Sequence, residues 1–135
     1  MRSYSKVIKL DLYKAKLYFY IVPDIPIKFA QIKQKLEDTV DSWDLLDPTE
    51  SGGLFFSLGC SRYFILIRQD CISHYFISHE IQHFIDEVTE NRGVEEVPRA
   101  YLSGYVHEEI HKFLISKNIE LVPWDGWKNM EATKS

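Results

Sequence analysis

Two apolar runs decide the fold of this chain: Leu54-Phe55-Phe56-Ser57-Leu58 and Tyr63-Phe64-Ile65-Leu66-Ile67. Each run is short, rich in aromatic and aliphatic residues and bounded by turn residues, which is typical of a β-strand. The segment between them, Gly59-Cys60-Ser61-Arg62, fits the loop of a hairpin. The pattern therefore predicts two adjacent strands in the middle of the chain.

Two further strands and a helix are predicted before this pair. Val7–Tyr13 alternates apolar and polar side chains, and Lys16–Val22 reads as a second strand. The short linker Lys14-Ala15 between them suggests a hairpin. From Ile27–Trp43 the apolar side chains recur at helical spacing. The first part of the chain thus has the expected order β-β-α.

Two helices are predicted after the central pair. The first begins within Ser73–Ser78 and runs to about Asn91, where Gly93 fits a C-terminal cap. The second begins within Glu95–Pro98 and runs to about Lys117. The whole order is then β-β-α-β-β-α-α. This order predicts an α+β fold in which an antiparallel sheet carries helices packed on one face.

The length and composition fit one folded domain. The chain has 135 residues, 45% of them hydrophobic and 14% aromatic, so it can bury a core without disulfides. We expect residues 1–123 to form this domain, with Ile119–Val122 as a short last strand. Residues 124–135 read as a polar C-terminal tail.

Charge and cysteine content restrict the partner and the compartment. The net charge of −4 argues against nucleic acid as the main partner, because phosphate binding needs a clustered positive surface. A local basic patch is still compatible with this net charge. Cys60 and Cys71 are too few for a disulfide scaffold and read as reduced thiols. No signal-peptide run follows the N-terminus, and Tyr63–Ile67 is too short to cross a bilayer. We therefore expect a cytoplasmic protein without a membrane partner; the oligomeric state stays open.

The segment His79-Glu80-Ile81-Gln82-His83 carries the main chemical prediction. Two histidines four residues apart on a helix project from the same side, so His79 and His83 could bind one tetrahedral Zn²⁺. Glu80 follows the first histidine directly. A glutamate there can take a proton from an activated water and pass it to a leaving amine. The motif predicts two zinc ligands and a general base.

The helical arrangement of this segment supports the prediction. Counted at 100° per residue from Ile77, His79 and His83 fall at roughly 200° and 240°. Glu80 falls at roughly 300°, between the histidines and an apolar stripe within about 340° to 80°. The stripe consists of Ile77, Ile81, Phe84, Ile85 and Val88. One side of the helix can pack on the sheet while the other presents the histidines. The competing interpretation is that both histidines simply face solvent, as in most His-x-x-x-His pairs.

A catalytic zinc needs a third protein ligand. The metzincin pattern is excluded, because Asp86 and Thr89 stand where it requires Gly and His. The remaining common choice is a carboxylate from the following helix, and we favour Glu96, with Glu95 as the substitute. The alternative is that both acids only serve the dipole of the helix N-terminus.

A second motif of the same form, His107-Glu108-Glu109-Ile110-His111, lies on the second helix. Three interpretations compete. The motif is a coincidence on a polar face, or His107 supplies a third or fourth ligand to the first site, or this second motif is the true metal site. Tyr101 and Tyr105 could donate a hydrogen bond from the hydroxyl to a developing oxyanion, although such tyrosines more often fill a core or its rim.

With these residues the chain resembles small gluzincin-like zinc metallopeptidase domains of the ImmA/IrrE type and SprT-like type, particularly short phage-encoded proteins. The matching segments are His79–His83 and Glu95–Tyr105, within residues 54–115. The sequence departs at Arg99, where ImmA-like proteins carry the acid directly before the alanine. The resemblance implies a minimal zincin-like fold and a zinc-dependent peptidase acting on a protein or peptide, in the host cytoplasm if phage-encoded.

The alternative function is a catalytically inactive binding module with the same fold, such as a phage protein that engages a host factor. Its aromatic residues could serve an interface, since aromatic side chains are enriched there. These residues are Tyr18, Phe19, Tyr20, Trp43, Trp124 and Trp127.

Overall fold

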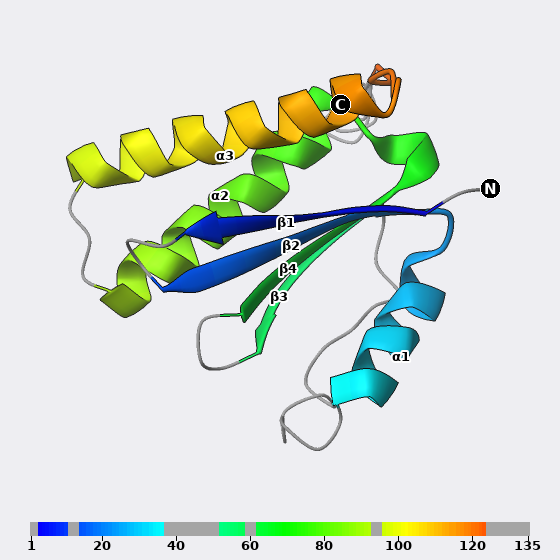
Figure 1. The fold of residues 1–135 in the computed structure, drawn as a ribbon, viewed down its shortest axis with the longest axis horizontal. Helices are drawn as coiled ribbons and strands as arrows, with labels where there is room; N and C mark the ends of the chain where they lie inside the picture. Colours follow the sequence, from blue (N-terminus) through cyan, green and yellow to red (C-terminus); the bar gives the residue numbers. More distant parts are fainter. Residues whose placement is uncertain (1–2, 11–13, 37–51, 59–61, 93–95, 124–135) are drawn as a thin grey trace, which may run out of the picture.

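The computed structural model describes residues 3–10, 14–36, 52–58, 62–92 and 96–123, which form a four-stranded sheet and three α-helices (Figure 1). The strands are β1 (Tyr4–Leu10), β2 (Ala15–Val22), β3 (Gly53–Leu58) and β4 (Arg62–Arg68). The helices are α1 (Ile25–Leu36), α2 (His74–Arg92) and α3 (Glu96–Ser116), with the short 3₁₀ helix η4 (Gln69–Cys71) before α2. The predicted α+β class and the order β-β-α-β-β-α-α are confirmed.

The sheet is mixed rather than antiparallel throughout. Its strand order is β1-β2-β4-β3, and the pairs β1/β2 and β3/β4 are antiparallel as predicted. The two hairpins meet through β2 and β4, which are parallel and pair Leu17 with Tyr63 and Phe19 with Ile65. The prediction of an antiparallel sheet is wrong for this pair. Since β3 forms the edge, the second hairpin brings β4 back into the middle of the sheet, beside β2.

Strand β4 is buried on both faces. Tyr63, Ile65 and Ile67 belong to the core under α2 and α3, whereas Phe64 and Leu66 belong to the core under α1. An unbroken apolar strand needs cover on both sides, because either uncovered face would expose large side chains to water. The prediction that the helices pack on one face is therefore wrong for α1, which covers the opposite face from α2 and α3 (Figure 1).

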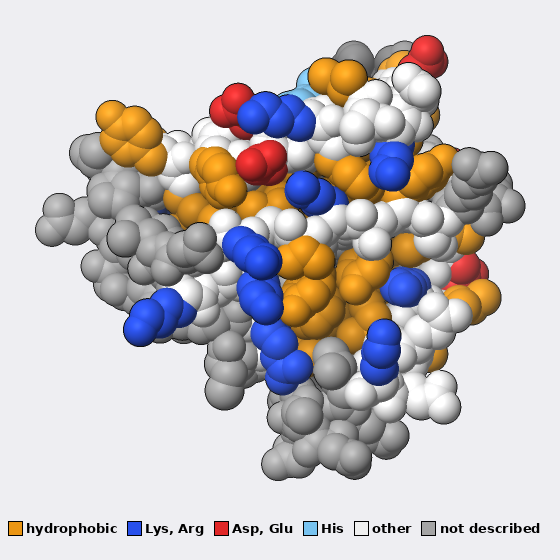
Figure 2. All heavy atoms as spheres, in the orientation of Figure 1, with side chains coloured by type: hydrophobic (Ala, Val, Ile, Leu, Met, Phe, Trp, Pro, Cys, Tyr) orange, Lys and Arg blue, Asp and Glu red, His pale blue; other side chains and the backbone are white. Residues whose placement is uncertain are grey.

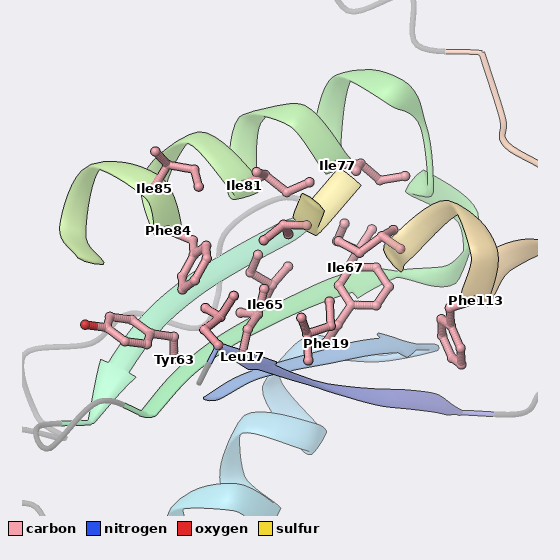
Figure 3. Packing of buried hydrophobic residues seen from close by; sticks show 14 of the residues in the cluster. Leu17, Phe19, Tyr63, Ile65, Ile67, Ile77, Ile81, Phe84, Ile85 and Phe113 are labelled. Atoms are coloured by element: carbon pink, nitrogen blue, oxygen red, sulfur yellow. The ribbon is translucent and has the colours of Figure 1, made fainter. Parts of the chain in front are cut away.

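The larger core joins α2 and α3 to the sheet (Figure 3). The apolar side of α2 faces the sheet, and Phe84 packs edge-on against Tyr63 with ring centroids 5.2 Å apart. Phe113 of α3 packs edge-on against Phe19 of β2 at 6.2 Å. The helical stripe predicted for α2 is confirmed, since all of its members are buried: Ile77, Ile81, Phe84, Ile85 and Val88. This packing fixes which side of α2 faces away from the sheet.

Helix α1 and strand β1 both begin earlier than predicted. Helix α1 begins at Ile25 rather than Ile27, because Asp24 caps it by accepting a hydrogen bond from Ile27 N at 2.8 Å. The predicted part of this helix beyond Leu36 lies outside the described residues. Strand β1 begins at Tyr4, three residues before the predicted start at Val7.

The predicted last strand over Ile119–Val122 is wrong. This segment is neither helix nor strand; Val122 N donates one backbone hydrogen bond to Ile72 O at 2.8 Å. Ile119 and Leu121 pack against the larger core. Of the predicted hairpin loop Gly59–Arg62, Arg62 is instead the first residue of β4. Residues 59–61 and the tail at 124–135 lie outside the described residues. Within the part that the structure describes, no helix is long and apolar enough to span a membrane.

Replacing Phe19 tests the larger core. Phe19 is fully buried in β2 and contacts Phe113 of α3. Phe19→Ala should lower the free energy of unfolding by about 3–5 kcal/mol, through lost burial and the cavity left behind. Urea unfolding followed by circular dichroism measures this change. The control Ile115→Ala, at a side chain 76% exposed, should stay within about 0.5 kcal/mol. A loss below about 1 kcal/mol for Phe19→Ala would contradict the assigned core.

Candidate metal site on helix α2

The N-terminus of α2 is held by a side-chain cap. Ser73, which is buried, accepts a hydrogen bond from Phe76 N at 3.2 Å. The helix then packs its apolar stripe on β3 and β4 and turns its polar side to solvent. His79 and His83 both lie on this exposed side. The helix therefore presents the two histidines as their spacing predicts.

The two imidazoles point at the same place. His79 Nε2 and His83 Nε2 lie 3.2 Å apart, and their rings are nearly perpendicular with centroids 4.7 Å apart. Each ring has an aromatic neighbour: Tyr75 stacks on His79 at 5.5 Å, and Phe55 of β3 stacks on His83 at 6.2 Å. These contacts restrict the rotation of both rings. Neither Phe55 nor Tyr75 was predicted as a neighbour of the site, because their positions depend on tertiary packing.

Glu80 lies between the histidines and the sheet. Its side chain is only 5% exposed, and it faces Gly53, the first residue of β3. A Cβ atom at Gly53 would lie 3.1 Å from Glu80 Oε1 and 3.1 Å from the ring of Phe76. Gly53 therefore leaves the space that the carboxyl occupies. Gly53 was not predicted to belong to the site; its place directly before an apolar strand was the available signal.

Burial raises the pKa of the Glu80 carboxyl to about 7. Desolvation is the cause, because a carboxylate loses hydration in an apolar environment. A carboxyl with a pKa near neutral pH can both accept and release a proton there. The position of Glu80 thus agrees with the chemistry expected of a general base, although a bound cation nearby would favour its ionised form.

The described residues bring two candidate ligands together, without a third. Within the ranges that the structure describes, no group of three or more His, Cys, Asp or Glu side chains is placed to hold a metal ion. Glu96 begins α3, but its side chain and the whole of Glu95 lie outside what is described, so both remain predictions. The position singled out by the resemblance, Arg99, donates a hydrogen bond to Asp86 of α2. Asp86 lies one helical turn after His83.

In the described structure His107 contacts α2 but does not join His79 and His83 in one group. Its Nε2 lies 3.5 Å from Ser78 Oγ, and its Nδ1 lies 2.8 Å from Ser103 O. His111 instead lies beside His74 of α2, with ring centroids 5.7 Å apart. The histidines of the second motif thus contact α2 at two separate points. This arrangement favours the interpretation that the second motif is a coincidence of spacing.

Tyr101, the predicted oxyanion donor, is 77% exposed on α3. It makes no hydrogen bond or ring contact within the described part of the chain. Its role stays a prediction that nothing in the present geometry supports.

Replacing Glu80 tests the burial of its carboxyl in metal-free protein. The folded-state pKa lies above the unfolded value, so the folded protein binds more protons and loses stability as the pH rises from about 4.5 to about 7. Glu80→Gln removes this titration. The difference in free energy of unfolding between the variant and the unmodified protein should therefore be about 1–3 kcal/mol more favourable to the variant at pH 8 than at pH 4. Urea unfolding with a chelator present measures the difference.

The matched control is Glu108→Gln, whose exposed carboxylate pairs with Lys112 at 3.5 Å. It should follow the pH profile of the unmodified protein. A Glu80→Gln variant whose relative stability does not change with pH would show that the carboxyl is not buried in solution.

Comparisons with protein-family models, with curated proteins and with solved structures give no match to this chain. The function is therefore argued from the site itself: two convergent imidazoles on an exposed helix face, beside a buried carboxyl held next to the first residue of an edge strand.

Proposed function

We propose that His79 and His83 bind Zn²⁺ and that the protein is a zinc-dependent peptidase. The observation that carries the proposal is the 3.2 Å separation of the two Nε2 atoms. In a tetrahedral site with Zn–N distances of about 2.0–2.1 Å, two ligating nitrogens lie about 3.3 Å apart. The two rings therefore fit one zinc ion without rearrangement of the helix. Without a metal, the same distance lets one Nε2–H donate a hydrogen bond to the other Nε2, so zinc would replace that hydrogen bond.

The residues around the histidines support hydrolysis rather than metal storage. A zinc ion, when bound, supplies a Lewis acid that polarises a carbonyl and promotes ionisation of water. Glu80 would accept a proton from the attacking water and deliver it to the leaving amine. Gly53 keeps the space for this carboxyl, and Phe55 and Tyr75 hold the imidazoles in position.

The edge of the sheet supports a peptide as substrate. Strand β3 lies at the end of the described sheet, next to α2. An edge strand offers backbone N–H and C=O groups that can pair with an extended peptide. Gly53 and Phe55 of this strand contact Glu80 and the His83 ring, so a peptide added to the edge would run beside the proposed site. We place this activity in a cytoplasm, that of the host if a phage encodes the protein.

A second candidate function is a zincin-like binding module without catalysis. The observation that favours it is the pair Arg99–Asp86, since a cation occupies the position at which the resemblance places an acid ligand. In the peptidase proposal the third ligand is Glu96, with Glu95 as the substitute. Zinc binding and Glu80-dependent cleavage separate the two functions.

Zinc titration of the chelator-treated protein tests the ligands. We expect about one equivalent of Zn²⁺ by isothermal calorimetry, and at least about tenfold weaker binding for His79→Ala and for His83→Ala. Glu96→Ala should weaken binding similarly if Glu96 is the third ligand. The matched control is His111→Ala, which removes a histidine of the same spacing from α3. Equal losses for His111→Ala, or no zinc bound by the unmodified protein, would contradict the proposed ligands.

Cleavage of β-casein, analysed by mass spectrometry, tests the activity. The zinc-loaded protein should produce fragments, and Glu80→Gln should lower the rate by about 100-fold or more while it still binds zinc. A tightly bound zinc with no cleavage would favour the binding module. Cleavage that persists in pure Glu80→Gln protein would exclude Glu80 as the general base.

A further inference from the structure

Several aromatic side chains lie on the sheet face opposite α2. Tyr18 and Tyr20 of β2 are half-buried on this face, and Tyr18 stacks on Phe64 of β4 with ring centroids 4.9 Å apart and planes 14° apart. Helix α1 packs on the same face, over a core shared with β3 and β4. A pocket of about 220 Å³ lies between helix and sheet. Its lining consists of Tyr18, Tyr20, Ile32, Lys35, Arg62 and Phe64.

A row of cations crosses the sheet beside these rings. Lys9, Lys16 and Arg62 stand directly opposite one another on β1, β2 and β4. Directly paired residues point to the same face of a sheet, and Arg62 lines the pocket, so all three lie on the aromatic face. At about 4.8 Å between strands, the row extends about 10 Å across the sheet.

Helix α1 adds cations on the other side of the rings. Lys28 Nζ lies 4.8 Å from the centroid of the Tyr20 ring, and Lys35 lines the pocket. In the described part of the chain, none of these five cations is in an ion pair, and the pocket lining contains no acid. Figure 2 shows Lys and Arg side chains on both sides of an apolar patch in the lower half of the view, below the sheet edge formed by β1. Positive charge without an ion-pair partner among the described residues is thus concentrated around half-buried aromatic rings.

We propose that this face binds single-stranded nucleic acid. Phosphates of a strand would lie against the row Lys9–Lys16–Arg62 and the lysines of α1, and unstacked bases would stack on Tyr18 and Tyr20. A polar or apolar partner would leave the cations without counter-charges, and an acidic peptide would not use the rings. The net charge of −4 is an average over the whole chain, whereas phosphate binding depends on where the cations gather. The proposal is independent of the zinc site, which lies across the sheet.

Fluorescence anisotropy with labelled oligothymidine and oligouridine, between about 50 and 200 mM salt, tests this surface in the full chain with and without chelator. Arg62→Ala and Lys16→Ala should each weaken binding and reduce the slope of log Kd against log salt by about 0.7. The matched control is Lys117→Ala, an exposed lysine directly after α3. It should leave both quantities unchanged. The two oligomers differ in the sugar and in the 5-methyl group of thymine, so a difference in affinity reports on both together.

Tyr20→Leu tests the stacking, because leucine keeps apolar contact without an aromatic face. Affinity should fall about tenfold, which corresponds to about 1.4 kcal/mol, while the salt slope stays the same. Urea unfolding confirms that the variant is folded; if it is not, Tyr20→Phe, which keeps the ring, should bind as the unmodified protein does.

Four results would overturn the proposal. They are no binding at the lower salt concentration, equal affinity for duplex DNA of the same length, equal loss on Lys117→Ala, and displacement by polyglutamate as effective as by unlabelled oligonucleotide. The last result would assign the face to acidic peptides. Loss of cleavage or zinc binding elsewhere has no bearing on these measurements.

Discussion

The burial of strand β4 on both faces constrains the rest of this structure. All five residues of Tyr63–Ile67 are large and apolar, and all are buried. A strand of this kind is stable only between two covering layers. Helices α2 and α3 form one layer and α1 forms the other, so the molecule has three layers with the sheet in the middle. The two faces of the sheet consequently carry different surroundings: a helix with convergent histidines on one, and aromatic rings flanked by cations on the other.

The same strand explains how far the sequence predicts the fold. The periods of Lys16–Val22 and of residues 77–88 predict a strand and a two-faced helix, and both are found, because each period is local. Which strands are neighbours is not local. The run Tyr63–Ile67 fits a β-hairpin equally well at an edge or at the centre of a sheet, so the parallel pairing with β2 did not follow from it. The apolar residues of Ile119–Val122 predicted a strand. In the structure two of them, Ile119 and Leu121, instead pack their side chains against the larger core without pairing to the sheet.

In the candidate site, too, the features set by local spacing could be predicted and those set by tertiary packing could not. The convergence of His79 and His83 could be predicted, since both side chains lie on one helix and their spacing sets the distance. The burial of Glu80 could not be predicted, because the helical angle placed it at a boundary and the absence of a side chain at Gly53 decides its surroundings. A ligand from α3 depends on how two helices are aligned. The contacts Arg99–Asp86 and His107–Ser78 fix that alignment, and they place Arg99 rather than an acid near the end of the motif.

The row Lys9–Lys16–Arg62 illustrates why an average charge predicts partners poorly. Each of the three residues is visible in the sequence, and the alternation of β1 and β2 assigns Lys9 and Lys16 to the face opposite the larger core. Arg62 joins them only because β4 lies beside β2, which is the pairing that local patterns did not predict. A four-strand antiparallel order with β4 at the edge would have separated Arg62 from Lys16. The pairing that buries β4 therefore also assembles the positive surface, and one topological feature underlies both the core and the proposed binding face.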